Sequence, residues 1–382
     1  MSVIPNFSGY FSKNVQKDVG ELYRASAVSN FAVSLVALFE PIFLYSVLHF
    51  SVPKVLLFMA VVYTVYILGI PFGGKIASRY GYRHSIALSV PFQIFFWLAL
   101  LASINHPSLA FFAAVMYGVQ KSFYWPGFHS VIARYAQSGQ VGREFGAAYA
   151  IGSLSQIGGP LLGGIISQYA GLPTAFFIAS VIYCFSLLPL LGLKEVFVPK
   201  EYLFSQTLAM YRSFPKKFIA YLGFGEDLLV LTVWPIFIYI VVTDYKDTGM
   251  LAATASLFAV ILALFLGQLS DQHTKHKLVK IGTFFNAVFW LARMAVGNFL
   301  GAFVMDTGSK ASKETLFIPL STITYMRAEQ THVVPYLVFF EQSLAIGKLS
   351  ACLIGALLFS LTGSFMVLFL LGALYSLFYL YI

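Results

Sequence analysis

Four ionisable residues lie near the middle of residues 300–327, an apolar stretch that is long enough to cross a lipid bilayer. They are Asp306, Lys310, Lys313 and Glu314, and their spacing places them on one stripe of a helix. An ionisable side chain in hydrocarbon costs about 2.5 to 3.5 kcal/mol on insertion scales, so such residues mark a pathway or a site by default. The sequence therefore predicts that this stripe faces water or a polar solute. Two alternatives stay open: ion pairs that only hold helices together, or a loop followed by a short helix.

More charged residues fall inside other apolar stretches, and the two signs suit different tasks. Removing a carboxylate from water favours its neutral form, which is the physical basis for binding a proton on one side of a membrane and releasing it on the other. A lysine can hold the carboxylate or phosphate of a solute as a point charge. For each acid, a static ion pair is the alternative. These residues are Glu40, Lys121, Glu226, Asp227, Glu341 and Lys348, whereas Arg293 lies near a span end and is expected to snorkel to the interface.

Glu40 is the first candidate for a proton carrier. Pro41 follows it and is expected to bend or open the helix, and its own span contains no basic residue. The full set of candidate proton-coupling residues is Glu40, Asp227, Glu226, Glu341 and Glu314.

The buried bases and a few aromatic residues are the candidate contacts for a solute. Both signs of charge together favour a polar, zwitterionic or anionic organic molecule over a purely lipophilic cation. Aromatic faces could stack on an amphipathic solute, although packing is an equal alternative, and a lone His129 is more often structural. The candidate substrate-binding residues are Lys121, Asp306, Lys310, Lys313, Lys348, Tyr45, Trp125, Trp234 and Tyr239.

The elements that position these residues must be membrane-spanning helices. The chain is 59% hydrophobic and only 10% charged, with a mean hydropathy of +0.81, whereas soluble domains average roughly 25% charged residues. No stretch is left for a soluble catalytic domain, and the first residues lack the apolar core of a signal peptide. Twelve stretches of spanning length are predicted, at 26–49, 53–77, 84–104, 107–135, 142–170, 172–193, 217–243, 249–270, 278–297, 300–327, 333–361 and 364–382.

The net charge of +9 reflects topology rather than nucleic-acid binding. With the N-terminus inside, nearly all loop Lys and Arg residues fall on the inner side, and only Lys54 and Lys246 lie on outer loops. We therefore expect a multi-pass protein of the cell membrane, in a bacterial inner membrane, with both termini in the cytoplasm. Cys184 and Cys352 both lie in apolar spans, and no Cys or His pair has metal-ligand spacing, so neither a disulfide nor a metal site is predicted.

An internal repeat divides the chain into two halves. Pro41 and Pro235, and likewise Gly163 and Gly355, lie roughly 193 residues apart in similar segments. We predict an all-α integral membrane protein with twelve transmembrane helices in two pseudo-symmetric six-helix bundles. The expected units are residues 1–193, a linker at 194–216 that contains an amphipathic surface helix, and residues 217–382.

The loop after the second span carries a motif that supports a family resemblance. It reads Gly74-Lys-Ile-Ala-Ser78-Arg79-Tyr-Gly81-Tyr-Arg83. With the repeat, this resembles the major facilitator superfamily, whose loop has an acid where Ser78 stands. The second half keeps Gly267 and Asp271 at the equivalent place. The resemblance implies that Gly74, Arg79, Gly81, Arg83, Gly267 and Asp271 latch the cytoplasmic gate, and that spans one, four, seven and ten line a central cavity.

The fifth span reads Gly146-(x8)-Ser155-(x3)-Gly159-Pro160-Leu-Leu-Gly163-Gly164. This is similar to a glycine pattern of the drug/proton antiporter branch, with Ser155 as its departure. Small residues on one face let helices approach closely, so the resemblance implies a pivot against span eight or eleven in which Gly159 and Pro160 act as gating residues. The arginine that the family often has early in span four is missing here.

These observations predict a secondary transporter, not an enzyme, that works by alternating access. We expect proton-coupled export of a small amphipathic or charged organic solute; proton-coupled uptake of a zwitterionic or anionic nutrient and lipid flipping are the alternatives. The expected partners are that solute, protons and the bilayer, with no nucleic acid and no cofactor, and the protein is expected to be a monomer. No nucleotide-binding loop is present in the sequence, which argues against an ATP-driven pump.

Overall fold

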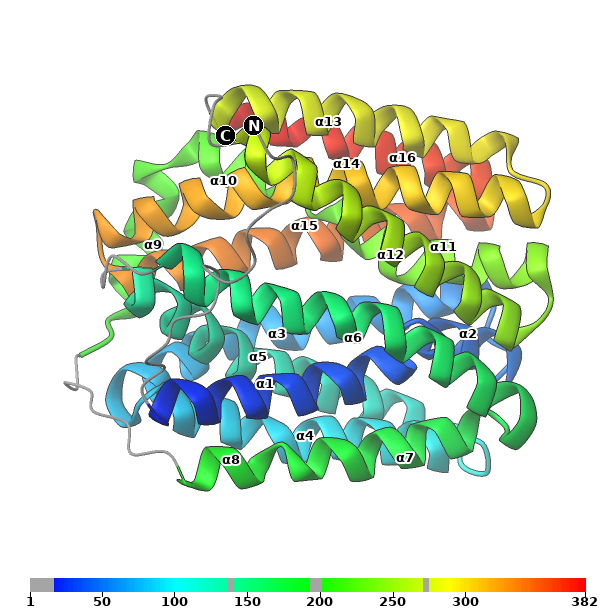
Figure 1. The fold of residues 1–382 in the computed structure, drawn as a ribbon, viewed down its shortest axis with the longest axis horizontal. Coiled ribbons are helices and arrows are strands. Elements are labelled where there is room, and N and C mark those ends of the chain that lie inside the picture. Colours follow the sequence, from blue (N-terminus) through cyan, green and yellow to red (C-terminus); the bar gives the residue numbers. More distant parts are fainter. Residues whose placement is uncertain (1–16, 137–140, 193–200, 271–274) are drawn as a thin grey trace, which may run out of the picture.

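The chain forms two bundles of roughly parallel helices, which a computed structural model describes for all residues except 1–16, 137–140, 193–200 and 271–274. Figure 1 shows the first half, in blue to green, beside the second half, in light green to red. The described residues are helical apart from short connections. Within the described residues, seven helical stretches, some of which combine two consecutive helices, are long and apolar enough to cross a membrane. The prediction of an all-α membrane fold in two bundles is confirmed.

The N-terminal bundle follows the predicted spans closely. Its first span is broken into two helices, and its sixth is broken near the end. The elements are α1 (Lys17–Val36), α2 (Phe39–Ser46), α3 (Val52–Tyr80), α4 (Tyr82–Ala102), α5 (Leu109–Ala136), α6 (Val141–Ala170), α7 (Leu172–Phe185) and α8 (Leu187–Gly192).

The linker helix and the C-terminal bundle follow. Here the seventh span begins as a short helix, and the ninth and twelfth end in 3-10 turns. The elements are α9 (Phe204–Ser213), α10 (Pro215–Leu222), α11 (Gly225–Val242), α12 (Tyr245–Ser270), α13 (Lys275–Ala292), η2 (Arg293–Ala295), α14 (Phe299–Glu329), α15 (Val333–Thr362), α16 (Phe365–Leu377) and η3 (Phe378–Tyr381).

The break in the first span has a simple cause. Proline has no N–H and its ring clashes with the carbonyl four residues earlier, so Pro41 interrupts the helix near Ala37. The chain turns at Ala37 and Leu38, and Glu40 consequently lies in the first turn of α2. The positive end of the helix dipole lies there and favours a carboxylate.

The two bundles touch at both ends of the spans. At the end away from the linker, which we call the far end, Ser46 and Tyr245 share a hydrogen bond of 3.1 Å between their hydroxyl oxygens. Toward the opposite end, the linker end, a Cβ on Gly74 would lie 2.8 Å from Val338 of α15. Nearer the middle of α3, the Gln342 side chain donates to the carbonyl oxygen of Ile67 at 3.1 Å. In this conformation the two bundles therefore contact each other on both sides of the middle of the spans.

Candidate functional site between the two bundles

Glu40 is a buried acid without a counter-ion. Its side chain accepts a hydrogen bond of 2.9 Å from the indole nitrogen of Trp97 on α4, and the residue is only 5% exposed. Tyr183 packs edge-on against the same indole, which keeps the surroundings apolar. Among the described residues, no Lys, Arg or His nitrogen lies within 4 Å of this carboxylate. Its closest neighbours are therefore aromatic side chains rather than charged ones.

The second bundle contains a related pair with a different balance of charge. Trp290 on α13 donates its indole N–H to Glu226 at 3.1 Å, as Trp97 does to Glu40. Glu226 is fully buried, but here Lys313 forms an ion pair with it and the Tyr379 hydroxyl donates to it at 3.2 Å. Glu226 is therefore held by one cation and two hydrogen-bond donors.

Sequence reasoning missed these two tryptophans, although a signal was present. Trp97 and Trp290 both stand in a Phe-Trp-Leu-Ala segment, and the two segments lie roughly 193 residues apart. That spacing is the period of the internal repeat.

The ion pairs of Glu226 continue toward the first bundle. Lys348 on α15 lies 2.7 Å from Asp227, and Lys313 lies 3.6 Å from the same carboxylate. The ammonium of Lys348 also lies 5.6 Å from the ring centre of Tyr63 on α3. Asp227 keeps 23% of its side chain exposed, so it borders space that a small polar molecule could reach. This group of charges thus faces the interface between the bundles.

Lys121 on α5 is a cation that contacts an aromatic ring. Its ammonium lies 4.1 Å from the ring centre of Tyr117, one turn earlier on the same helix. Among the described residues it makes no ion pair within 4 Å. Glu40, Asp227 and Lys348 are all within electrostatic reach of it. Lys121 therefore lies among the charges of both bundles and has a free positive charge to offer an anion.

The charged stripe on α14 divides between two environments. Lys313 reaches Glu226, whereas Asp306 and Lys310 pair with each other at 2.7 Å. Lys310 also donates to the Ala252 carbonyl at 2.9 Å, and Asp306 accepts from the Trp234 indole at 2.9 Å. These contacts lie within the C-terminal bundle: the ion pair is within α14, and its two members also hydrogen-bond to α12 and α11. Glu314 is half-buried, and its side chain also has an interaction partner.

Arg293 is buried. Its place near a span end had predicted that it would reach the membrane interface. Only 1% of the residue is exposed. Its guanidinium lies between two indoles, 4.5 Å from the ring centre of Trp234 and 3.9 Å from that of Trp290, and it donates to Ser309 at 3.0 Å. Cation–π contacts on both faces replace part of the hydration of the guanidinium. The two aromatic faces explain why this side chain turns inward instead of snorkelling.

Glu341 lies in a separate cluster toward the linker end. The Tyr66 hydroxyl donates to one of its oxygens at 2.5 Å, and the other oxygen lies 2.5 Å from Nε2 of His129. Nδ1 of His129 lies 2.6 Å from the Tyr325 hydroxyl. This cluster places His129 at the bundle interface.

The four aromatic candidates are distributed over the length of the interface. Trp125 is half-buried and stacks on His129 with 5.3 Å between ring centres. Tyr239 stacks on Tyr245 at the far end, 5.0 Å apart, and Tyr45 is partly buried near the same end. Trp234 is buried inside the C-terminal bundle beside Asp306. Only Trp125 thus borders the cluster around His129.

Comparison with known proteins fits this arrangement of two bundles around charged helices. The family model described as Major Facilitator Superfamily matches residues 22–219. The chain belongs to the Major Facilitator Superfamily. A crystal structure of an auto-inhibited peptide transporter of the POT family superposes with a TM-score of 0.73 at 13% identity, over 96% of both chains. At this identity the likeness shows the fold alone. A search of curated proteins finds no match.

The superfamily loop motif lies at the linker end, where the bundles meet. A Cβ on Gly74 would lie 2.8 Å from Val338 of α15, so only glycine allows this approach. Gly81 separates α3 from α4 with φ of +100°, a conformation that favours glycine. Arg83 donates to the Leu191 carbonyl at 2.9 Å, and Arg79 packs over Tyr80. Of the second copy, Gly267 lies in α12, and Asp271 is outside the described residues.

The glycine-rich fifth span of this superfamily member, α6, packs against two neighbours. A Cβ on Gly159 would collide with Ser34 of α1. One turn further on, a Cβ on Gly164 would lie 3.2 Å from the Cα of Gly249 on α12, and Pro160 faces the same glycine. Span five therefore makes close contact with span eight at the far end, and a pivoting role for this contact stays a prediction.

The linker helix α9 docks on α15 of the second bundle. The Thr207 hydroxyl donates to the Pro335 carbonyl at 3.2 Å, and the Tyr211 hydroxyl donates to Gln342 at 3.4 Å. Burial raises the pKa of Tyr202 and of Tyr211 to about 12, so both phenols stay protonated at neutral pH. Because Gln342 donates in turn to Ile67, the linker is connected to the contact between α3 and α15.

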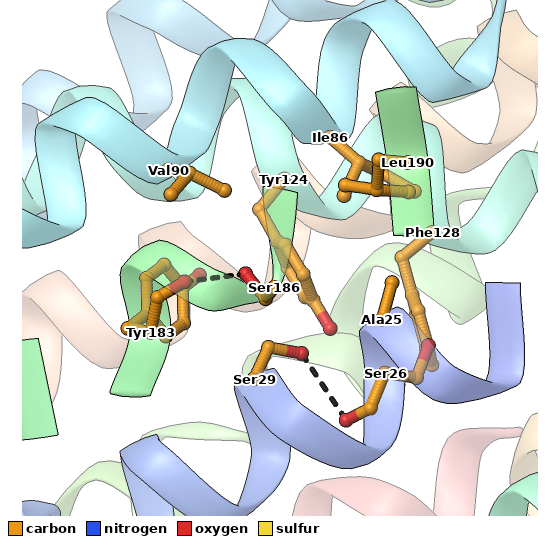
Figure 2. Close-up of a pocket in the computed structure, with 10 residues that line it drawn as sticks. All are labelled: Ala25, Ser26, Ser29, Ile86, Val90, Tyr124, Phe128, Tyr183, Ser186 and Leu190. Carbon is orange, nitrogen blue, oxygen red and sulfur yellow. Dashed lines mark hydrogen bonds between the residues drawn. The ribbon is translucent and has the colours of Figure 1, made fainter. Parts of the chain in front are cut away.

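A small cleft also opens inside the N-terminal bundle (Figure 2). Ser26 and Ser29 of α1 and Tyr124 of α5 contribute hydroxyls, and Ile86 and Leu190 contribute apolar surface. Ser29 donates to the backbone carbonyl of Ser26 at 3.1 Å. No charged residue lines this cleft, so it does not match the charged solute that the interface favours.

Proposed function

We propose that this protein is a proton-coupled secondary transporter that takes up a small organic solute with an anionic group, such as a zwitterion or an organic acid. The observation that carries the proposal is the pair formed by Lys121 and Glu40. One is a cation with no acid within 4 Å, and the other is a buried acid with no cation within 4 Å, among the described residues. They lie within electrostatic reach of each other.

This pair links proton binding to solute binding. While Glu40 is charged, its field partly neutralises Lys121 and repels an anion. When Glu40 takes a proton, the full charge of Lys121 becomes available to a carboxylate or phosphate. The protonated carrier therefore binds an anionic solute more tightly than the unprotonated carrier does. By thermodynamic reciprocity, the solute also tightens proton binding. Joint binding of proton and anion is the requirement for symport.

Asp227 offers a place for an amine of a zwitterionic solute. It is partly exposed, and Lys348 and Lys313 already contact it. An ammonium group of the solute would compete with these lysines for the carboxylate. The distance between the two ends of the solute would then be set by the separation of Lys121 and Asp227 across the bundle interface.

The remaining charges of the C-terminal bundle form a frame. Glu226 and Asp306 each accept an indole N–H and each pair with a lysine, and Arg293 is inserted between the two indoles. Two such pairs joined by a buried guanidinium fix helices α11, α13 and α14 relative to one another. We propose that this frame moves as a unit during alternating access, and that Lys310, Glu314 and Lys313 belong to it rather than to the solute.

Export of a cationic amphipathic solute is the second candidate, which the pattern around Ser155, Gly159 and Pro160 favours. A cation would compete with the proton for Glu40, and such competition leads to antiport. Lipid flipping finds less support. Gly74 abuts Val338 near one end of the contact between α3 and α15, and a Cβ on Gly355 would lie 3.3 Å from Leu56 near the other. Lateral entry of a lipid along this contact is therefore blocked in this conformation.

Reconstitution in liposomes separates these functions. The purified protein is placed in vesicles with an imposed pH gradient, and amino acids, dipeptides, organic acids and cationic amphiphiles are offered in turn. Symport predicts that an acidic outside drives accumulation of an anionic or zwitterionic solute. Glu40→Gln and Lys121→Gln should abolish this accumulation, whereas Lys246→Gln, at an exposed position at the start of α12, should not change it. Accumulation only of cations against an opposite gradient would favour export and would contradict the proposal.

A further inference from the structure

The cluster around Glu341 joins two helices of each bundle. Tyr66 belongs to α3 and His129 to α5, in the first bundle. Glu341 belongs to α15 and Tyr325 to α14, in the second. The three hydrogen bonds described for this cluster, of 2.5, 2.5 and 2.6 Å, therefore each join a residue of one bundle to a residue of the other. The bundles cannot separate at the linker end without breaking these bonds.

The surroundings of this cluster are nearly dry. The side chain of His129 is 9% exposed and that of Glu341 only 4%. Trp125 stacks on one side of the imidazole, and Phe340 packs edge-on against it at 5.8 Å. Water solvates an unbalanced charge poorly in such a place. The stability of this pair therefore depends strongly on how many protons it holds.

Counting protons shows which state of the pair is stable when the gate is closed. With one proton shared between His129 and Glu341, the pair is an imidazolium and a carboxylate, or two neutral groups, and its net charge is zero. With no shared proton the pair carries a net negative charge, and with a second proton a net positive one. The charged neighbours are Lys121 on α5 and Lys348 on α15, both within electrostatic reach of Glu341. The groups that face the pair from α3 and α14 are the phenols of Tyr66 and Tyr325.

We propose that His129 and Glu341 form a second proton-binding site, separate from Glu40, which latches the gate at the linker end while one proton is shared between them. When the bundles part at this end, water reaches both groups and the shared proton leaves from the imidazole. The distribution of Lys and Arg predicts that the linker end is cytoplasmic, so this proton is delivered to the cytoplasm. The proposal rests on the alternating-access function above, but its test requires neither a solute nor flux.

Linkage gives the sign of the pH effect. The closed gate binds the shared proton more tightly than the open gate does, so proton binding stabilises the closed gate. The stabilisation is present while the pair holds the shared proton and is lost as the pH rises and that proton leaves. Raising the pH should therefore open the linker end, by at most about tenfold in the equilibrium constant per pH unit for one proton.

A distance measurement at the linker end tests this directly. Spin labels are attached to cysteines at Tyr80, at the end of α3, and Gln330, just after α14, in a protein that carries Cys184→Ser and Cys352→Ala. Electron–electron distances are then measured in lipid nanodiscs from about pH 5.5 to about pH 8.5, the range around the ordinary titration of histidine. We expect the population with a long distance to grow with pH in the otherwise unchanged protein.

Variants identify the groups responsible. His129→Gln should make the distance distribution independent of pH. Tyr325→Phe, which keeps the ring and removes only the hydroxyl that faces Nδ1, should shift the pH dependence without removing it. The matched control is His84→Gln, because His84 is an exposed histidine on α4 near the same end, and it should retain the full pH dependence.

Two results would overturn the latch. One is a distance distribution that does not change with pH while the protein remains folded. The other is a pH dependence that survives in His129→Gln but disappears in His84→Gln. If gate opening follows pH through His129 while no proton-driven flux is found, the latch stands and the proposed transport function fails. If proton-driven flux is found while gate opening does not depend on pH through His129, the transport function stands and the latch fails.

Discussion

Trp97 donates its indole N–H to Glu40 at 2.9 Å, and Tyr117 is a second hydrogen-bond partner of that carboxylate. The equivalent pair in the second bundle, Trp290 and Glu226, adds a lysine and a phenol to the carboxylate. The internal repeat has thus produced two glutamate–tryptophan pairs of unequal charge. Lys313 pairs with the acid of the second bundle, whereas no cation lies within 4 Å of Glu40 among the described residues.

Replacing Glu40 by glutamine should uncouple transport from the proton. Glutamine keeps the size of the side chain and accepts from Trp97, but it cannot exchange a proton. We expect solute exchange across vesicles at equal pH to remain within about threefold of normal, because the solute contacts are retained, and gradient-driven accumulation to disappear. Counterflow and pH-driven uptake in the same vesicle preparation measure the two quantities. Normal accumulation in Glu40→Gln would show that another acid carries the proton.

Lys121 should set the affinity for the anionic group of the solute. A hydrogen bond to a charged group contributes about 1.5 to 3 kcal/mol, so Lys121→Gln should weaken solute binding by roughly 10- to 150-fold at 1.4 kcal/mol per tenfold. Lys121→Arg retains the charge and should lose less. Binding to the detergent-purified protein can be followed by calorimetry. Equal affinities in the glutamine variant and in the unchanged protein would remove Lys121 from the site.

The pair of Lys313 and Glu226 should contribute to stability rather than to coupling. Removing one partner of a buried ion pair leaves an uncompensated charge and costs about 3 to 5 kcal/mol. We therefore expect Lys313→Met alone to lower the midpoint of thermal unfolding strongly. The double variant Lys313→Met with Glu226→Gln leaves no unpaired charge and should recover most of the loss. If the double variant unfolds at the same temperature as the single one, the pair is not the reason for the loss.

Gly249 should control closure of the far end. A Cβ at this position would lie 2.2 Å from the carbonyl oxygen of Pro160, which belongs to backbone and cannot yield easily. Gly249→Val should therefore keep α6 and α12 apart at the far end. A cysteine at Ser46, which bonds to Tyr245 in the present conformation, should then react faster with a water-soluble maleimide. Gly297→Val is a suitable control, because nothing lies within 4 Å of a Cβ there.

Much of the fold was predictable because its signals are local. Spanning length, the repeat and the proline after Glu40 predicted two bundles and the broken first helix. The partners of the charges were less accessible, since they depend on which side chains meet across helices. Asp306 and Lys310 are four residues apart, so their pairing follows from helical spacing. By contrast, His129 and Glu341 are 212 residues apart, more than half of the chain, and no pattern in the sequence brings them together.

Arg293 shows the same limit from another direction. A cation near the end of a span usually snorkels to the interface. It turns inward here because Trp234 and Trp290 offer it two aromatic faces, and each of those indoles is itself tied to a buried acid. The repeated Phe-Trp-Leu-Ala segments identify Trp97 and Trp290 in advance, but the stacking depends on three helices packing together.

The most direct test of the coupling between Glu40 and Lys121 is proton exchange upon solute binding. Once the vesicle panel has identified a solute, it is added to the purified protein in a weakly buffered solution that contains a pH-sensitive dye. We predict that solute binding draws about one proton from solution per protein, and that Glu40→Gln abolishes this uptake while solute still binds. Release of a proton on binding, or unchanged uptake in Glu40→Gln, would contradict the account.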